Sequence, residues 1–429
     1  MIIRKLHLLT FIAALPLAAF GAEKDGGAIT LRGALARTLR GSPELAAFDY
    51  DLRAAEARIL QAGLRPNPTL GLDIENPTGS GPYKNAEQME NTLTLSQLIE
   101  LGGKRPARIF AAETERALVE WDYQIRRVAV LRQTTLVFID ALVAQRRREL
   151  AEEVVRVSGE TVKLTEERVK VGRGSAVETI RARVAVASAQ IEIEQSRRDL
   201  ETARGSLAAQ WGAKAADCGE VRGDLETHEN GPSLHTLRQR LPRNPDLARW
   251  TAERERREAA LARERTLARP DLTLLAGPRV TGRGDDATFV AGFSIPLPFS
   301  NRNQGNIAAA RENLGKIAEE TRAAEARAYA ALNEAFQKLR SAAREIAILE
   351  ESVIPGARDA EQQLIDGYAV GRFTQFEVLD ARRTLNTARV QQLRAHADFQ
   401  KARAELDALT AVPIELPKPV TKPGAPPRK

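Results

Sequence analysis

Alternating apolar and polar residues mark four short segments of the chain. In the first of them, leucine and isoleucine occupy every second position, and threonine, glycine, aspartate and glutamate fill the positions between. This period of two is typical of a β-strand with one apolar face and one polar face. The four predicted strands are residues 69–75, 91–96, 271–276 and 288–295.

Four strands are too few to close a barrel, and an open sheet edge is not tolerated in lipid. One interpretation is therefore a pair of soluble hairpins packed on helices. The other is that several protomers contribute strands to one membrane barrel, with apolar side chains outside and polar side chains inside. The N-terminal sequence described below favours the membrane interpretation.

The pattern between the strands changes to the longer period of helices. Ser42 and Pro43 predict the start of a helix that reaches about Gly63, because Ser is a common N-cap and Pro fits the first helical position. A proline-free helix is predicted from Ala107 to Lys170, about 100 Å long at 1.5 Å per residue. Its counterpart runs from about 303 to 370, with a kink at Pro355 and Gly356. Helices of this length are expected to bundle, and several protomers could wall a tunnel.

Each long helix ends in the same short motif. Gly172 and Gly371 are expected in the left-handed conformation that ends a helix. Ser175 with Glu178, and Thr374 with Glu377, fit the capping box that begins the next helix. Each half of the chain therefore ends in a tight helical hairpin, and a ring of such tips suits docking to a partner with matching symmetry.

Glu377 and Asp380 lie one turn apart just after the second tip. In an oligomer they would form acidic rings at the narrow end of a tunnel and attract cations. The alternative is that Glu377 only caps the helix and Asp380 is a solvated residue. The sequence leaves both possibilities open, whereas for Glu178 it favours the capping role.

The two halves repeat one another. Residues 42–46 (SPELA) match residues 244–248 (NPDLA), and residues 171–173 match residues 370–372, each about 200 residues later. This internal repeat predicts that the halves pack together, since neither has an obvious core of its own. The expected division is a first repeat at 28–212, a link at 213–232 and a second repeat at 233–412.

The N-terminus has the three parts of a secretion signal. Arg4 and Lys5 precede an apolar stretch at residues 6–20, and small residues follow. We expect residues 1–21 to be a cleaved signal peptide rather than a short membrane anchor, since the stretch is short and ends in small residues. No other run of 18 apolar residues occurs, so no transmembrane helix is expected. A Pro-rich, basic tail at 413–429 is expected to be disordered.

Composition argues against several functions. The net charge is +7, but arginine and glutamate alternate along the helices, which indicates solvated faces and no nucleic-acid binding. After the signal, His228 and His235 lie in the link between the halves and His396 is alone on the last helix. Cys218, the only cysteine, is expected to be a small packed residue without a disulfide. No catalytic, metal or cofactor motif is present, so we expect no enzyme.

Two segments carry a family resemblance. Residues 95–105 (LSQLIELGGKR) and 299–305 (FSNRNQG) resemble TolC-like outer membrane efflux proteins, in particular the outer membrane subunits of cobalt-zinc-cadmium and copper-silver efflux systems. The resemblance extends over residues 28–412. It implies a mainly α-helical protein with a membrane β-barrel. Specifically, it implies a homotrimer in the outer membrane lipid, with a barrel of twelve strands, four per protomer, continuous with an α-helical barrel and an equatorial belt in the periplasm.

The resemblance also implies partners and functional residues. The partners are a periplasmic adaptor and a proton-driven inner-membrane pump of the resistance-nodulation-division class. The implied adaptor-docking tips are Gly172, Arg173, Gly174, Ser175, Gly371, Arg372, Phe373 and Thr374. The implied periplasmic aperture is formed by Glu178, Tyr368, Glu377 and Asp380.

The chain departs from its relatives in two ways. Phe373 stands where some relatives have an arginine involved in closure, and Arg372 lies one residue earlier. Many relatives carry an acylated N-terminal cysteine, for which this sequence has no counterpart.

The resulting expectation is a passive exit duct for divalent heavy-metal cations. A duct for drugs or for type I protein secretion is the first alternative. A periplasmic coiled-coil adaptor or scaffold without a pore is the second.

Overall fold

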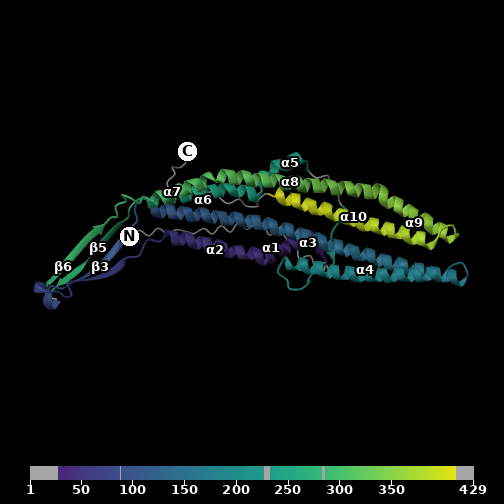
Figure 1. The fold of residues 1–429 in the computed structure, drawn as a ribbon, viewed down its shortest axis with the longest axis horizontal. Coiled ribbons are helices and arrows are strands. Elements are labelled where there is room, and N and C mark those ends of the chain that lie inside the picture. The colour runs from purple at the N-terminus through teal and green to yellow at the C-terminus, as the bar shows by residue number, and fades with distance from the viewer. Residues whose placement is uncertain (1–27, 87, 227–231, 283–285, 412–429) are drawn as a thin grey trace, which may run out of the picture.

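The computed structural model describes residues 28–86, 88–226, 232–282 and 286–411. The expected signal peptide, the tail at 413–429 and His228 lie outside these residues. The chain is elongated, with a β-sheet at one end and a long helical body that forms the rest of the molecule (Figure 1).

The sheet contains four antiparallel strands in the order β2-β3-β5-β6. Their bounds are β2 Thr69–Glu75, β3 Glu90–Ile99, β5 Leu272–Thr281 and β6 Asp286–Ser294. All four predicted strands are confirmed, although β3 and β5 are several residues longer than their alternating patterns suggested. The hairpin of each half joins the other through β3 and β5, so the two halves form one sheet.

The register places most apolar residues on one face and all charged residues on the other. Leu70 lies opposite Leu95, Leu95 opposite Ala276, and Ala276 opposite Ala291. This apolar face is exposed in the single chain, with Leu70 at 68% and Phe293 at 72%. The five charged residues of the strands all lie on the opposite face: Asp73, Glu75, Glu90, Arg279 and Asp286.

The helical body contains long helices that run nearly parallel to one another (Figure 1). In the first half they are α2 Pro43–Gly63, α3 Lys104–Lys170 and α4 Ala176–Ala209. In the second half they are α6 Pro245–Leu267, α7 Gln304–Gly315, α8 Ile317–Ile348, α9 Ile354–Ala369 and α10 Gln375–Leu409. The shorter elements are β1 Ile29–Thr30, α1 Leu31–Gly41, η1 Gly81–Ala86, β4 Val221–Arg222, α5 Leu234–Arg240, η2 Leu241–Arg243 and η3 Leu349–Val353.

The first long helix is confirmed, but it begins at Lys104 rather than at Ala107. Pro106 fits inside its first turn because a backbone N–H at that position would have no partner within the helix. The helix that begins at Pro43 is also confirmed, and Ser42 is its N-cap residue, although the Ser42 side chain makes no capping hydrogen bond.

The second long helix differs from the expectation. It is interrupted at Lys316, between α7 and α8, which the sequence reading missed. It is interrupted again by η3, a π-helical stretch that ends two residues before Pro355. Pro355 has no N–H to donate to the carbonyl four residues earlier, and that residue lies inside η3. The irregularity therefore lies one turn before the expected kink.

The two halves share a hydrophobic core. Phe138 and Leu142 of α3 pack in one buried cluster with Leu207 of α4, Val221 of β4 and Ala397 of α10. Cys218 is a buried free cysteine in the same cluster, as expected. The cluster joins the long helices of both halves to the link between them.

One 18-residue window of α3 is apolar enough to cross a membrane by length and composition, with a mean hydropathy of 1.4. The sequence reading did not single it out. Of this window, 44% is buried inside the chain, and the core helix of a soluble protein meets the same criterion. Its apolar character is accounted for by the core that α3 forms with α4 and α10.

Candidate functional site at the helical hairpin tips

Both predicted hairpins are present, and their tips lie at the same end of the body, far from the sheet (Figure 1). Tip 1 is residues 171–175, between α3 and α4, and tip 2 is residues 370–374, between α9 and α10. The helices leading into the two tips are parts of different halves. The chain therefore presents two similar turns side by side.

The two tips end their helices in the same way. Gly172 and Gly371 have φ angles of 72° and 82°, as their left-handed role requires. The Arg173 N–H donates to the Arg168 carbonyl at 2.9 Å, and the Arg372 N–H donates to the Gly367 carbonyl at 2.8 Å. These are Schellman motifs, which satisfy carbonyls that the helix leaves free.

The two tips begin their second helices differently. At tip 2 the capping box is confirmed, since Thr374 accepts from the Glu377 N–H at 3.4 Å and the Thr374 N–H donates to Glu377 Oε2 at 2.7 Å. At tip 1 the predicted box of Ser175 and Glu178 is wrong. Ser175 accepts from the Val177 N–H at 3.2 Å, and the Glu178 side chain turns away from the cap.

Glu178 instead binds the other hairpin. Its Oε2 accepts a hydrogen bond from the Tyr368 hydroxyl at 3.2 Å. The Arg168 guanidinium lies 4.3 Å from the centre of the Tyr368 ring, and its Nη1 donates to the Tyr368 carbonyl at 3.2 Å. Tyr368 is buried, and burial raises the pKa of its hydroxyl. The nearby Glu178 carboxylate raises this pKa further. Tyr368 therefore links α9 to both helices of the first hairpin.

Phe373 packs against the helix that precedes tip 2. A Cβ atom at Gly367 would lie 2.2 Å from the Phe373 ring, so the ring occupies the space that any larger residue at 367 would need. Phe373 therefore closes tip 2 by apolar contact, where some relatives have an arginine.

The acidic pair on α10 is exposed, as expected. Glu377 is held by its cap, and the N–H and hydroxyl of Thr374 lower the pKa of its carboxyl. Asp380 is exposed too, and within the described residues its carboxylate makes no ion pair. The structure supports the capping role of Glu377 and leaves Asp380 open to solvent.

The sequence reading missed an apolar feature of the tips. Val171 and Val370 directly precede the two tip glycines and are 69% and 73% exposed. Phe376, on the first turn of α10, is 62% exposed. The sequence contained a sign of this feature, because the repeat aligns Val171 with Val370, each directly before a tip glycine. Exposed apolar groups around a polar turn are typical of a protein contact.

The sequence reading also missed polar contacts that hold α10 in place near tip 2. Gln375 is buried and donates to the Thr165 hydroxyl of α3 at 3.2 Å. Arg382 donates to Glu361 of α9 at 3.1 Å and also hydrogen-bonds Thr161 of α3. These partners are far apart in sequence, so no local pattern could have paired them.

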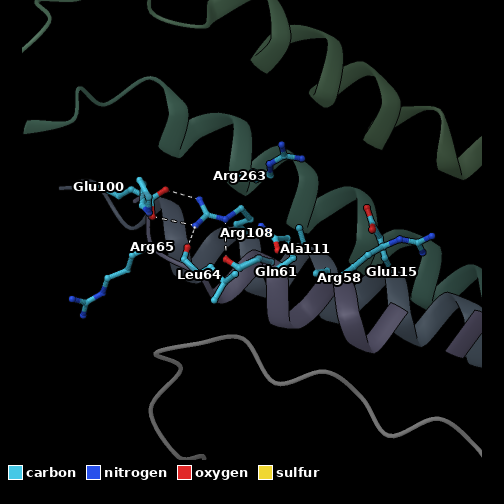
Figure 2. A pocket seen from close by; sticks show the side chains of 12 residues that line it. Arg58, Gln61, Leu64, Arg65, Glu100, Arg108, Ala111, Glu115 and Arg263 are labelled. Carbon is cyan, nitrogen blue, oxygen red and sulfur yellow. Dashed lines mark hydrogen bonds and ion pairs between the residues drawn. The ribbon is translucent and has the colours of Figure 1, made fainter. Parts of the chain in front are cut away.

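A second candidate site lies at the opposite end of the helical body. A cavity of about 460 Å³ is bounded by α2, α3 and α6, and four arginines line it: Arg58, Arg65, Arg108 and Arg263 (Figure 2). Arg108 is fixed there, because it donates to both oxygens of Glu100, at 2.5 and 3.1 Å, and to the carbonyls of Ala62 and Leu64. These bonds tie the end of α2 to the residue that follows β3, which is a structural joint rather than a reaction centre.

Within the described residues, no three His, Cys, Asp or Glu side chains are grouped closely enough to hold a metal ion. His396 is buried on α10 with Glu350 at 3.4 Å, and His235 contacts Gln239 on α5.

Comparison with known proteins identifies the family. A sequence model described as "Outer membrane efflux protein" matches residues 34–213 and 236–412. The cobalt-zinc-cadmium resistance protein CzcC of Cupriavidus metallidurans is 31% identical over 387 residues, which is 90% of this chain and 91% of that protein. The nickel-cobalt-cadmium resistance protein NccC of Alcaligenes xylosoxydans is 27% identical over 74% of this chain and 70% of its own length.

Solved structures share the fold at low identity. A membrane protein from Pseudomonas aeruginosa has a TM-score of 0.74 at 17% identity, with 89% of this chain and 90% of that chain covered. The outer membrane protein VceC of Vibrio cholerae has a TM-score of 0.72 at 19% identity, with 90% and 97% covered. CusC has a TM-score of 0.72 at 16% identity, with 89% and 92% covered.

The match to the family model covers most of the chain and excludes the alternative of an adaptor or scaffold without a pore. The solved structures have the same mostly helical TolC-like architecture. The chain therefore belongs to the outer membrane efflux protein family and is an outer membrane efflux channel that extends into the periplasm.

Proposed function

We propose that the chain is a passive exit duct for divalent heavy-metal cations such as cobalt, zinc and cadmium. The observation that carries the choice of cargo is the identity of 31% with a cobalt-zinc-cadmium resistance protein over nearly the whole of both chains. A periplasmic adaptor and a proton-driven inner-membrane pump of the resistance-nodulation-division class deliver the cations and supply the energy.

In this proposal three copies of the chain form the duct. Each contributes four strands to a closed barrel of twelve, in which β6 of one protomer pairs with β2 of the next. Two features support this arrangement. The sheet has two open edges, which lipid does not tolerate, and its apolar face contains none of the charged residues of the strands.

The duplicated halves then supply matching helical hairpins, so that each protomer brings two tips to the periplasmic end. The tips at 171–175 and 370–374 dock the adaptor, and the exposed Val171 and Val370 support an apolar contact there. Glu178, Tyr368, Glu377 and Asp380 form the aperture. The bond between Glu178 and Tyr368 supports a closed resting position, because it joins the two hairpins of one chain.

The proposed cargo is tested by deleting the gene and restoring it on a plasmid. Growth is measured across salts of zinc, cobalt, cadmium, nickel, copper and silver, together with a set of dyes and antibiotics. We expect sensitivity only to some of the metals and full rescue by the restored gene.

A second strain tests docking at the tips: it receives a chain in which Val171 and Val370 are both changed to Asp. This variant should assemble normally but fail to restore metal tolerance. Trimer assembly of this variant is checked by size exclusion in detergent. Sensitivity to organic compounds with normal metal tolerance would contradict the metal cargo and favour the duct for drugs or secreted proteins. Rescue by the variant would contradict docking at the tips.

A further inference from the structure

We infer that Arg279 prevents divalent cargo from being trapped in the wall of the duct. The inference rests on the proposed function, since it requires the polar face of the sheet to line the passage. Arg279 occupies a pair of glutamates that would otherwise be a binding site for a divalent cation. It is thus a residue that determines how freely the cargo passes.

Arg279 of β5 is held by two groups on the adjacent β3 and one on β2, the strand beyond it. Its Nη1 donates to Glu90 Oε2 of β3 at 2.6 Å, and its Nε donates to the buried Thr92 hydroxyl at 2.9 Å. Its Nη2 lies 3.3 Å from Glu75 Oε2 of β2. The guanidinium of β5 therefore bridges two carboxylates, one from β3 and one from β2.

The register brings the two carboxylates together. Glu75 lies directly opposite Glu90, and Thr92, two residues along β3, lies opposite Arg279. Side chains at directly opposite positions on one face have Cβ atoms about 5 Å apart, and two like charges there repel each other. Arg279 offsets this repulsion, and it is the only cationic side chain in the four strands.

Two adjacent carboxylates are suitable ligands for a divalent cation. Oxygen ligands hold hard cations, and borderline cations such as zinc also accept carboxylates. A cation that passes through a duct must bind weakly enough to leave again. A guanidinium stays charged at all physiological pH values, so it occupies the glutamate pair permanently. Cargo therefore meets a carboxylate pair that a bound guanidinium has already half neutralised.

The test compares cadmium binding by full-length purified variants, measured by equilibrium dialysis with radioactive Cd²⁺. We expect Arg279→Gln to bind Cd²⁺ at least ten times more tightly than the wild type does. The triple variant E75Q/E90Q/R279Q should lose this gain, because it lacks the carboxylates. Arg302→Gln is the control of equal charge, since Arg302 is exposed and within the described residues forms no ion pair.

Binding by R279Q equal to that of the wild type, with unchanged circular dichroism and trimer size, would overturn the inference. An equal gain in R302Q or in the triple variant would also overturn it. If R279Q does not assemble, Arg279→Lys decides instead: it keeps one charge but cannot bridge both glutamates, and cadmium affinity should then rise by a smaller factor.

Conductance in planar bilayers separates this inference from the proposed function. In R279Q, added Cd²⁺ should block the potassium current that the wild type carries unblocked. Because the proposed resting position is closed, absence of current would count against the duct itself only if Tyr368→Phe, which is expected to open the tip, carries no current either. The dialysis result would still show whether Arg279 occupies a cation-binding pair.

Discussion

Glu178 and Glu377 hold equivalent positions after the two tips, but their side chains have different partners. Glu377 caps its own helix, whereas Glu178 accepts a hydrogen bond from Tyr368 of the other half. Among the residues that differ between the halves, one accounts for the partner of Glu178. The position equivalent to Tyr368 in the first half is Val169, which has no hydroxyl to offer. Two related tips thereby form one asymmetric contact within the chain.

Tyr368→Phe tests this contact, because it removes the hydroxyl and keeps the ring under Arg168. A hydrogen bond to a charged group that is partly exposed contributes about 1–2 kcal/mol. We expect the tip to open more readily, and the single-channel conductance of the variant in planar bilayers to exceed that of the wild type. Tyr329→Phe is the control, since Tyr329 is an exposed tyrosine on α8. The same rise in both variants would contradict a specific role for Tyr368.

The same contact has a defined pH dependence. Burial first, and the Glu178 carboxylate second, raise the pKa of Tyr368 above its ordinary value near 10. Because the pKa of Tyr368 is raised, the stabilisation from its protonated hydroxyl is complete below the ordinary tyrosine pKa. It is lost as the pH rises from that value through the raised pKa. We therefore expect the difference in conductance between the wild type and Tyr368→Phe to stay constant from pH 6 to pH 8. A difference that vanished within that range would assign the effect to another group.

Residue partners were the least predictable part of the site. The S/T-x-x-E pattern described both tips equally well, yet only one capping box formed. A glutamate at the third helical position can reach back to its own cap or outward to a neighbouring element. The choice depends on a tyrosine 190 residues away, which the local sequence does not contain.

At the level of elements, α4 and α10 begin with different caps. The two helix starts are therefore expected to respond differently when the pH is lowered. The cap lowers the pKa of Glu377, so its stabilisation is present above the ordinary carboxyl value near 4.5 and is lost as the pH falls below it. We expect amide exchange at residues 375–378 of the wild type to accelerate, relative to Glu377→Gln at the same pH, only as the pH is lowered below about 4.5. The start of α4 is the internal control because it lacks the box, and equal acceleration there would contradict the prediction.

Elements themselves were predicted well where one pattern governs a whole segment. Period-two alternation located all four strands, and Gly172 located the end of α3 at Lys170. The interruptions of the second long helix were harder to find. Pro355 predicted one of them, but the π-helical turn lies before the proline. The other interruption, at Lys316, has no proline nearby.

For the whole molecule, the single chain shows a sheet whose two faces are both exposed. Nothing in the described structure covers Leu70, Leu95 or Phe293, and the charged residues of the strands all lie on the opposite face. Such a pattern is explained when one face meets lipid and the other meets water. The sequence predicted these two faces, but it could not determine how many chains complete the sheet, because that depends on contacts between copies.

Two neighbouring substitutions separate a membrane barrel from a soluble sheet. Leu95 and Ser96 are adjacent on β3 and point to opposite faces. Arginine on the lipid face of a membrane barrel costs about 2–4 kcal/mol near the bilayer midplane, whereas arginine in the lumen is tolerated. We therefore expect Leu95→Arg to reduce the amount of trimer in the outer membrane fraction several-fold, and Ser96→Arg to leave it nearly unchanged. In a sheet exposed to water on both faces, an arginine at Leu95 would instead improve solubility, so equal amounts of both variants would count against the barrel.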